Sequence, residues 1–134
     1  MASIKLPSVY RGYWTSEHYS GRFAEGLVQL EFKSDKQVHA IFKYKGTFRK
    51  GRVVEFDCVM GSGVVPFTID ACIFDTQKLT FNVTTAESTE LSGNYTSSNP
   101  YDRGNFVLRP KDMVGFSDRA FEPDPPADNN CLLF

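Results

Sequence analysis

The sequence predicts an all-β protein whose eight antiparallel strands run up and down and close into a barrel. Apolar and polar residues alternate in eight short runs, which turns one face of each run toward a core and the other toward water. The turns between the runs are too short to hold crossover helices, so neighbouring strands are expected to pair antiparallel. Closure into a barrel also removes the two unpaired edges that an open sheet would leave.

The strands are expected in the following order. The first carries Gly12-Tyr13-Trp14, and in the second Val28, Leu30 and Phe32 alternate with polar residues. The third to eighth runs keep the period of two, which indicates that each has one buried face. Their inward sets are Val38, Ala40, Phe42 and Tyr44; Val54, Phe56, Cys58 and Met60; Phe67, Ile69, Ala71 and Ile73; Leu79, Phe81 and Val83; Leu91 and Tyr95; and Phe106 and Leu108.

A two-layer sandwich is the alternative architecture. Sandwiches usually contain at least one long Greek-key connection, and the sequence offers none. The short turns therefore favour the barrel. Turn signals lie at 34–36, 49–51, 61–63, 75–77, 86–88 and 99–102.

The alternating pattern stops at Pro110, which divides the chain into a barrel domain, 1–110, and a C-terminal extension, 111–134. The segment 111–121 has apolar residues that allow one helical turn. From Glu122 onward the Pro-rich acidic sequence indicates an extended, flexible tail.

Composition narrows the function. Fifteen Lys and Arg against sixteen Asp and Glu give a net charge of −1, which argues against a nucleic-acid binder. No apolar run has the length of a signal peptide or a membrane span, and three cysteines fit a reducing compartment better than a disulfide framework, so we expect a cytoplasmic protein. The sequence gives no oligomeric state.

Catalytic and metal-binding patterns are absent from the sequence. His18 and His39 do not pair with a Ser or Cys in a nucleophile motif, and 61–63 is too short for a phosphate loop. We therefore expect no catalytic residue, no metal and no cofactor. A small barrel enzyme of the isomerase or cyclase type, acting on an apolar substrate, is the alternative.

The Gly12-Tyr13-Trp14 triplet, the eight-stranded meander and an Arg in the last strand together resemble the calycin superfamily of lipocalins, fatty-acid-binding proteins and avidins. The resemblance implies that Trp14 plugs one end of the barrel and that Arg109 packs across its indole in a cation–π contact. It covers about residues 10–110.

A barrel of eight strands is either filled by its side chains or holds one small ligand. Because the inward set is mostly apolar and aromatic, we expect a non-catalytic binding protein for a small hydrophobic ligand or a protein partner. The candidate ligand-binding residues are Trp14, Leu30, Phe32, Phe42, Tyr44, Phe56, Phe67, Phe81 and Tyr95.

The last four residues, from Cys131 to Phe134, form a C-a-a-X box that would favour geranylgeranylation of Cys131. One lipid chain is a marginal anchor, so a membrane tether would need a basic patch to contact an anionic membrane surface. The alternatives are an apolar tail that docks on its own domain and a hairpin that is only a solvated edge. The candidate basic residues lie on one hairpin: Lys43, Lys45, Arg49, Lys50 and Arg52.

Overall fold

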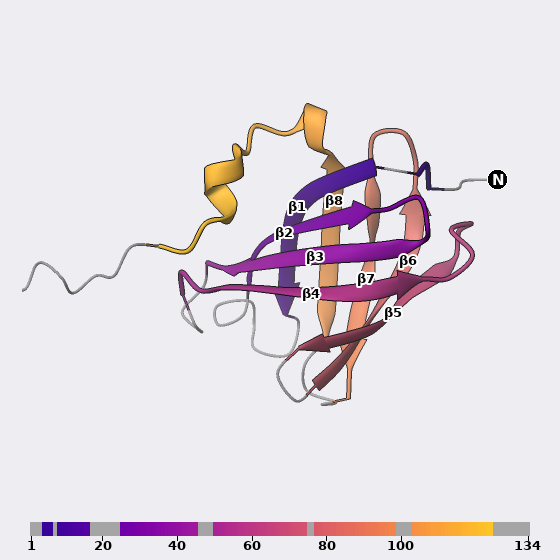
Figure 1. The fold of residues 1–134 in the computed structure, drawn as a ribbon, viewed down its shortest axis with the longest axis horizontal. Coiled ribbons are helices and arrows are strands. Elements are labelled where there is room, and N and C mark those ends of the chain that lie inside the picture. The colour runs from indigo at the N-terminus through magenta and orange to yellow at the C-terminus, as the bar shows by residue number, and fades with distance from the viewer. Residues whose placement is uncertain are drawn as a thin grey trace, which may run out of the picture.

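Eight antiparallel strands close into a barrel in chain order, as the sequence predicts (Figure 1). The computed structural model describes residues 4–6, 8–16, 25–45, 50–74, 77–98 and 103–124, with the backbone alone at 71–74 and 77. The strands are β1 (Ser8–Ser16), β2 (Glu25–Phe32), β3 (Gln37–Tyr44), β4 (Val53–Met60), β5 (Phe67–Phe74), β6 (Gln77–Ala86), β7 (Leu91–Ser97) and β8 (Gly104–Pro110).

The barrel closes along the seam between β1 and β8. Gly12 lies opposite Leu108 and Trp14 opposite Phe106 in this antiparallel pair. A Cβ atom at position 12 would overlap the carbonyl oxygen of Val107, so only glycine allows the two strands to approach this closely. The close approach of β1 and β8 at the seam therefore requires the glycine of the Gly-x-Trp triplet.

The interior is packed with apolar side chains. Trp14 is 5% exposed, which confirms its predicted burial. Phe32, Val38, Leu91 and Leu108 are wholly buried. Because the strands alternate, each contributes every second residue to this core. The largest fully buried side chains are Phe32, Phe81, Phe106, Leu30, Ile69, Leu91, Leu108, Val28, Val38, Val83 and Cys58.

The ladder between β4 and β5 is incomplete. The two strands pair only at Val59 with Asp70 and at Met60 with Ile69, and they separate toward the start of β4 (Figure 1). The inward side chains of Val54 and Phe56 in that first half of β4 are only partly buried. The core is therefore less completely covered at this opening in the hydrogen-bonded wall than at the seam, where Trp14, Phe106 and Leu108 are buried.

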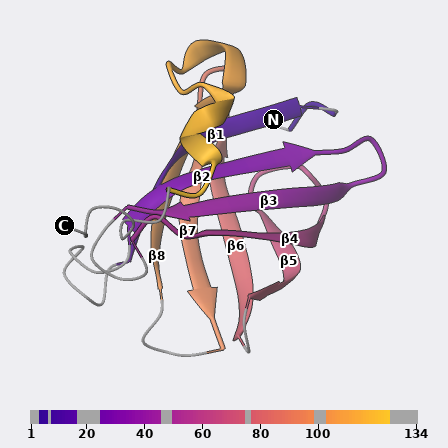
Figure 2. The ribbon, with the colours of Figure 1, turned by 60° about the vertical axis from the view of Figure 1, so that its left-hand side comes forward.

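The described part of the C-terminal extension lies against the barrel. After β8 the chain forms two short 3₁₀ helices, η1 (Lys111–Met113) and η2 (Asp118–Phe121). Figure 2 shows this segment crossing the outer face of β1, β2 and β3. We call residues 111–124 the strap, and the outward side chains of β1–β3 the outer wall.

One sequence expectation about the cysteines is wrong. Cys58, on β4, is disulfide-bonded, whereas an odd number of cysteines led us to expect reduced thiols. The chain holds two other cysteines, Cys72 and Cys131, whose side chains lie outside those described. Among the described residues, none of the helices has the length and apolar character needed to cross a membrane.

Candidate functional site

Aromatic rings surround Trp14 inside the barrel. Its indole lies 5.6 Å from the Phe42 ring, 5.3 Å from Tyr44 and 6.2 Å from Tyr95, measured between centroids. The Tyr44 and Tyr95 rings meet it edge to face, an arrangement that the ring quadrupoles favour. We call these four residues, with Phe81, the aromatic end.

Phe42 is the centre of a stack that joins the aromatic end to the opening beside β4. It stacks on Phe56 at 5.5 Å and on Phe81 at 5.7 Å, with interplanar angles of 20° and 25°. Phe56 is the partly exposed member of this stack. A continuous row of ring contacts therefore runs from the buried indole through Phe42 to the partly exposed Phe56.

Two buried polar atoms in this region have no hydrogen-bond partner. Within the described part of the chain, these are Nε1 of Trp14 and Oγ of Ser16. Both residues have inward positions on β1, two residues apart. A buried donor left unsatisfied costs about 1–3 kcal/mol, so an acceptor placed here would be favoured.

All nine residues predicted to bind a ligand belong to the core or pack against it. The structure brings six of them into one chain of ring contacts, namely the aromatic end and Phe56. Phe32 instead contacts Tyr10 at 5.9 Å, and Leu30 and Phe67 occupy other parts of the core. Ligand contact by any of the nine stays a prediction.

The prediction that Arg109 packs across the indole of Trp14 is wrong. Arg109 is exposed and pairs with Arg11, whereas the strand partner of Trp14 on β8 is Phe106. Because side chains alternate along β8, Arg109 shares the outward face with Val107 and cannot reach the indole. The indole is covered by aromatic rings instead.

Arg11 is a buried cation on the outer wall, and the sequence did not point to it. Its side chain donates to Oε1 of Gln29 at 2.6 Å, to the carbonyl oxygen of Phe116 at 3.0 Å and to the carboxylate of Asp118. The guanidinium also lies 5.1 Å from the centroid of the Phe121 ring. The hydrogen bond from Arg11, with the nearby charge of Lys111, lowers the pKa of Asp118.

Lys43 is the second buried cation of the outer wall, and it too is paired with the strap. Its Nζ lies 2.8 Å from Oδ1 of Asp124, whose backbone N–H donates to the carbonyl oxygen of Gly51 at 3.1 Å. Gly51 has φ of +86°, and a Cβ there would lie 2.7 Å from Oδ2 of Asp124. The hydrogen bond from Lys43 lowers the pKa of Asp124.

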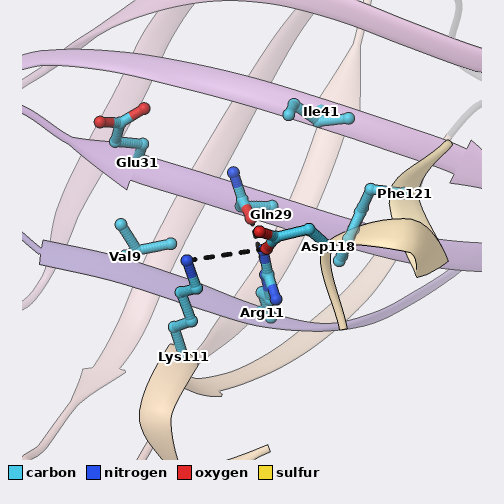
Figure 3. Close-up of a pocket in the computed structure, with 8 residues that line it drawn as sticks. All are labelled: Val9, Arg11, Gln29, Glu31, Ile41, Lys111, Asp118 and Phe121. Atoms are coloured by element: carbon cyan, nitrogen blue, oxygen red, sulfur yellow. Dashed lines mark hydrogen bonds and ion pairs between the residues drawn. The ribbon is translucent and has the colours of Figure 1, made fainter. Parts of the chain in front are cut away.

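A groove of about 380 Å³ lies between the outer wall and the strap. Figure 3 shows Lys111 and Arg11 converging on the Asp118 carboxylate, with Phe121 reaching over the sheet from η2. The Lys111 ammonium is 3.7 Å from that carboxylate. The residues that line the groove are Val9, Arg11, Gln29, Glu31, Ile41, Lys111, Asp118 and Phe121.

His39 lies between two carboxylates on the outer face of β3 and β4. Its Nδ1 is 2.9 Å from Oδ1 of Asp57 and its Nε2 is 2.8 Å from Oε1 of Glu55. The hydrogen bond to Asp57 is the main cause that raises the pKa of His39, and Glu55 adds to it. The two carboxylates therefore favour the protonated form of the imidazole.

Only some of the basic residues that were predicted to contact a membrane are exposed on the hairpin. Lys43 is buried and paired with Asp124, so its assignment to an anionic surface is wrong. Lys45, Lys50 and Arg52 are exposed. Arg49 and the predicted lipidation site, Cys131, lie outside the described residues, and lipidation stays a prediction from the sequence.

The polar contacts of the outer wall were missed because residues 111–121 were expected to form one helical turn with no assigned partner, and the residues from Glu122 onward were expected to be an extended, flexible tail. A signal was present, since Phe116, Asp118, Phe121 and Asp124 place aromatic and acidic residues together in one short segment. Such a segment is complementary to a surface that carries both cations and apolar groups.

Comparison with known proteins leaves the family open. No protein-family profile matches the chain, and no curated protein shows significant similarity to it. Over the part of the chain that the structure describes, no group of three or more His, Cys, Asp or Glu residues is arranged to hold a metal ion.

Proposed function

We propose that this chain is a non-catalytic, calycin-like binding protein for a small, mostly apolar ligand that carries a hydrogen-bond acceptor. The ligand site is the aromatic end, where the ligand lies against Phe42, Tyr44 and Tyr95. The observation that carries the proposal is the pair of buried donors, Trp14 Nε1 and Ser16 Oγ, that have no partner within the described part of the chain.

The chemistry of the site argues for this ligand class. Aromatic faces and edges favour an apolar body, and the two unpartnered donors favour an acceptor oxygen at one end of it. A ligand acceptor that bonds to the indole N–H removes the cost of leaving that donor unpaired. A hydrocarbon of the same shape cannot do so.

Access is proposed at the start of β4. The ladder to β5 is missing there, and Val54 and Phe56 are the partly exposed members of the inward set on that strand. The opposite seam between β1 and β8 is fully paired, so it offers no comparable opening. The interior is packed, so the ligand displaces side chains at the opening rather than filling a large void.

The composition of the core supports binding rather than catalysis. The buried charged residues that the structure describes, Arg11 and Lys43, lie on the outer wall, and the described buried residues that point inward include no carboxylate, histidine or lysine. General acid–base chemistry most often uses such groups, and less often a tyrosine, within hydrogen-bond reach of the substrate. The isomerase or cyclase alternative would therefore depend on a core tyrosine such as Tyr44 or Tyr95.

A titration that follows fluorescence tests the proposal, because Trp14 is the single tryptophan of the chain. We expect cyclohexanone to change the emission of Trp14 and to bind about 2–10 times more tightly than methylcyclohexane, the range that one net hydrogen bond supplies. Ser16→Ala should reduce this preference for the ketone. Tyr13→Phe, which changes an exposed hydroxyl on the outer face of the same strand, is the matched control.

Two results would overturn the proposal. One is an emission spectrum that neither compound changes at concentrations up to its solubility. The other is equal affinity for ketone and hydrocarbon in the wild-type chain, which would show that the donors take no part.

A further inference from the structure

The strap contacts the outer wall mainly through its side chains, as a short bound peptide contacts a receptor. Its regular structure is limited to 3₁₀ helices of three and four residues. Among the described residues, its backbone makes two hydrogen bonds to the barrel: the N–H of Asp124 donates to the carbonyl oxygen of Gly51, and the carbonyl oxygen of Phe116 accepts from Arg11. The remaining contacts are made by side chains, two of them aromatic and two of them acidic.

The outer wall is built to receive negative charge. The side chains of Arg11 and Lys43 are 5% and 7% exposed, whereas their partners Asp118 and Asp124 remain 78% and 49% exposed. Cations on the outward face of a sheet are ordinarily solvated, and a buried cation needs a partner. The wall therefore supplies two buried cations, and the strap supplies their counter-charges from outside.

Apolar contacts lie between and beside these two cations. Strand pairing places Leu27 between Tyr13 on β1 and Lys43 on β3, and Leu27 is buried although it points outward. The Phe116 ring packs edge to face on Tyr13 at 5.4 Å, and Phe121 lies over Arg11. The wall thus recognises aromatic rings together with carboxylates.

We propose that the outer wall is a docking surface for an acidic, aromatic segment of a partner protein, and that the strap occupies it as an internal competitor. The partner segment carries two carboxylates about six residues apart, as Asp118 and Asp124 are in the strap. The charge complementarity of Arg11 and Lys43 to these carboxylates carries the assignment. The groove beside Phe121 gives additional room for a partner side chain. This proposal does not depend on the ligand site inside the barrel.

Covalent attachment to the barrel explains why the strap, and not a partner segment, occupies the outer wall in the isolated chain. A segment attached through a short linker competes at an effective concentration in the millimolar range. Each ion pair joins a buried cation of the wall to an exposed carboxylate of the strap. Reversing both carboxylate charges places like charges against Arg11 and Lys43, so it should release the strap and leave the apolar core inside the barrel unchanged. A partner segment then binds a surface that is already formed.

The test uses the full-length chain with Asp118→Lys and Asp124→Lys, which reverses both strap charges. A fluorescein-labelled peptide with the sequence of residues 114–124 is titrated against this variant and against the wild type. We expect the peptide to bind the variant at least about ten times more tightly, because the internal competitor is gone. Binding should weaken as salt is raised.

Two controls separate docking from simple charge attraction. The double variant Asp35→Lys and Glu87→Lys changes the net charge equally at exposed positions outside the strap that have no ion pair in the described structure. We expect it to bind the peptide as weakly as the wild type does. A peptide with lysine at both aspartate positions should not bind the released variant, and circular dichroism should show an intact barrel in every variant.

Three results would overturn the proposal. The peptide fails to bind the released variant although its barrel is intact, or it binds the control variant equally well. The third is a stable dimer of the wild-type chain in sedimentation, which would assign the wall to the strap of a second copy.

Discussion

The two faces of β1 are both buried, but by different means. Trp14 on the inner face is 5% exposed and is covered by aromatic rings from other strands. Arg11 on the outer face is 4% exposed and is covered by polar and charged groups of the strap and by one aromatic ring. Burial inside depends on shape and apolar area, whereas burial outside depends on charge and hydrogen bonds.

This difference assigns the stability of the fold to the inner face and the reversible contact with the strap to the outer face. Aromatic packing in a closed barrel is insensitive to salt and pH, and its loss leaves a cavity. Ionic contacts to a short strap are screened by salt and weakened by protonation. The inner face is therefore suited to holding the fold, and the outer face to a contact that forms and breaks.

The largest expected effect comes from the inner face. Trp14→Ala should lower the free energy of unfolding by about 3–5 kcal/mol, since it removes a large buried ring. Tyr13→Ala, one position along the strand, should cost about 1 kcal/mol, because its ring is 58% exposed and packs on Phe116 alone among the described rings. Urea unfolding of the two variants measures this contrast, and equal losses would contradict the division between the faces.

The next effect concerns acid release of the strap. The pKa values of Asp118 and Asp124 are lowered from 3.8 in the folded chain, by Arg11 and Lys43 respectively. A lowered pKa stabilises docking above pH 3.8 and loses that stabilisation as pH falls through the folded-state value. Amide signals of the strap should therefore show detachment in this acidic range while the Trp14 indole signal stays unchanged. Simultaneous loss of both would show that strap and core unfold together.

The smallest expected effect is at His39. Its pKa is raised above 6.5, mainly by the hydrogen bond to Asp57, so its contribution to stability is complete below pH 6.5 and disappears as pH rises through the folded-state value. Asp57→Asn should lower the pKa measured by NMR more than Glu55→Gln does. An imidazole that titrates below 6.5 in the wild type would contradict the assignment.

The barrel was predictable because its signals are local. Alternation along runs such as 38–44, together with short turns, determines which side chains point inward, and the structure confirms the eight strands and their closure. The burial of Trp14 was predicted instead from the resemblance that the Gly12-Tyr13-Trp14 triplet carries.

The outer wall was not predictable by those rules. An outward arginine or lysine has the same period-two signal whether it is solvated or covered, so Arg11 and Lys43 gave no sign of burial. The covering segment begins where alternation ends, after Pro110. The error at Arg109 has a different cause: alternation places this residue on the outward face with Val107, and the resemblance to a family was followed instead. The disulfide of Cys58 was missed because the pairing of strands had to be known first.

The indole N–H of Trp14 gives the most direct test of the ligand site, because a single tryptophan gives a single indole cross-peak in a ¹H–¹⁵N spectrum. The account predicts a resonance without hydrogen-bond deshielding in the free protein, which moves downfield with cyclohexanone and does not move in that direction with methylcyclohexane. An indole proton that is already hydrogen-bonded in the free protein, or one that the ketone leaves in place, would contradict the central claim that Trp14 offers an unpaired donor to a ligand.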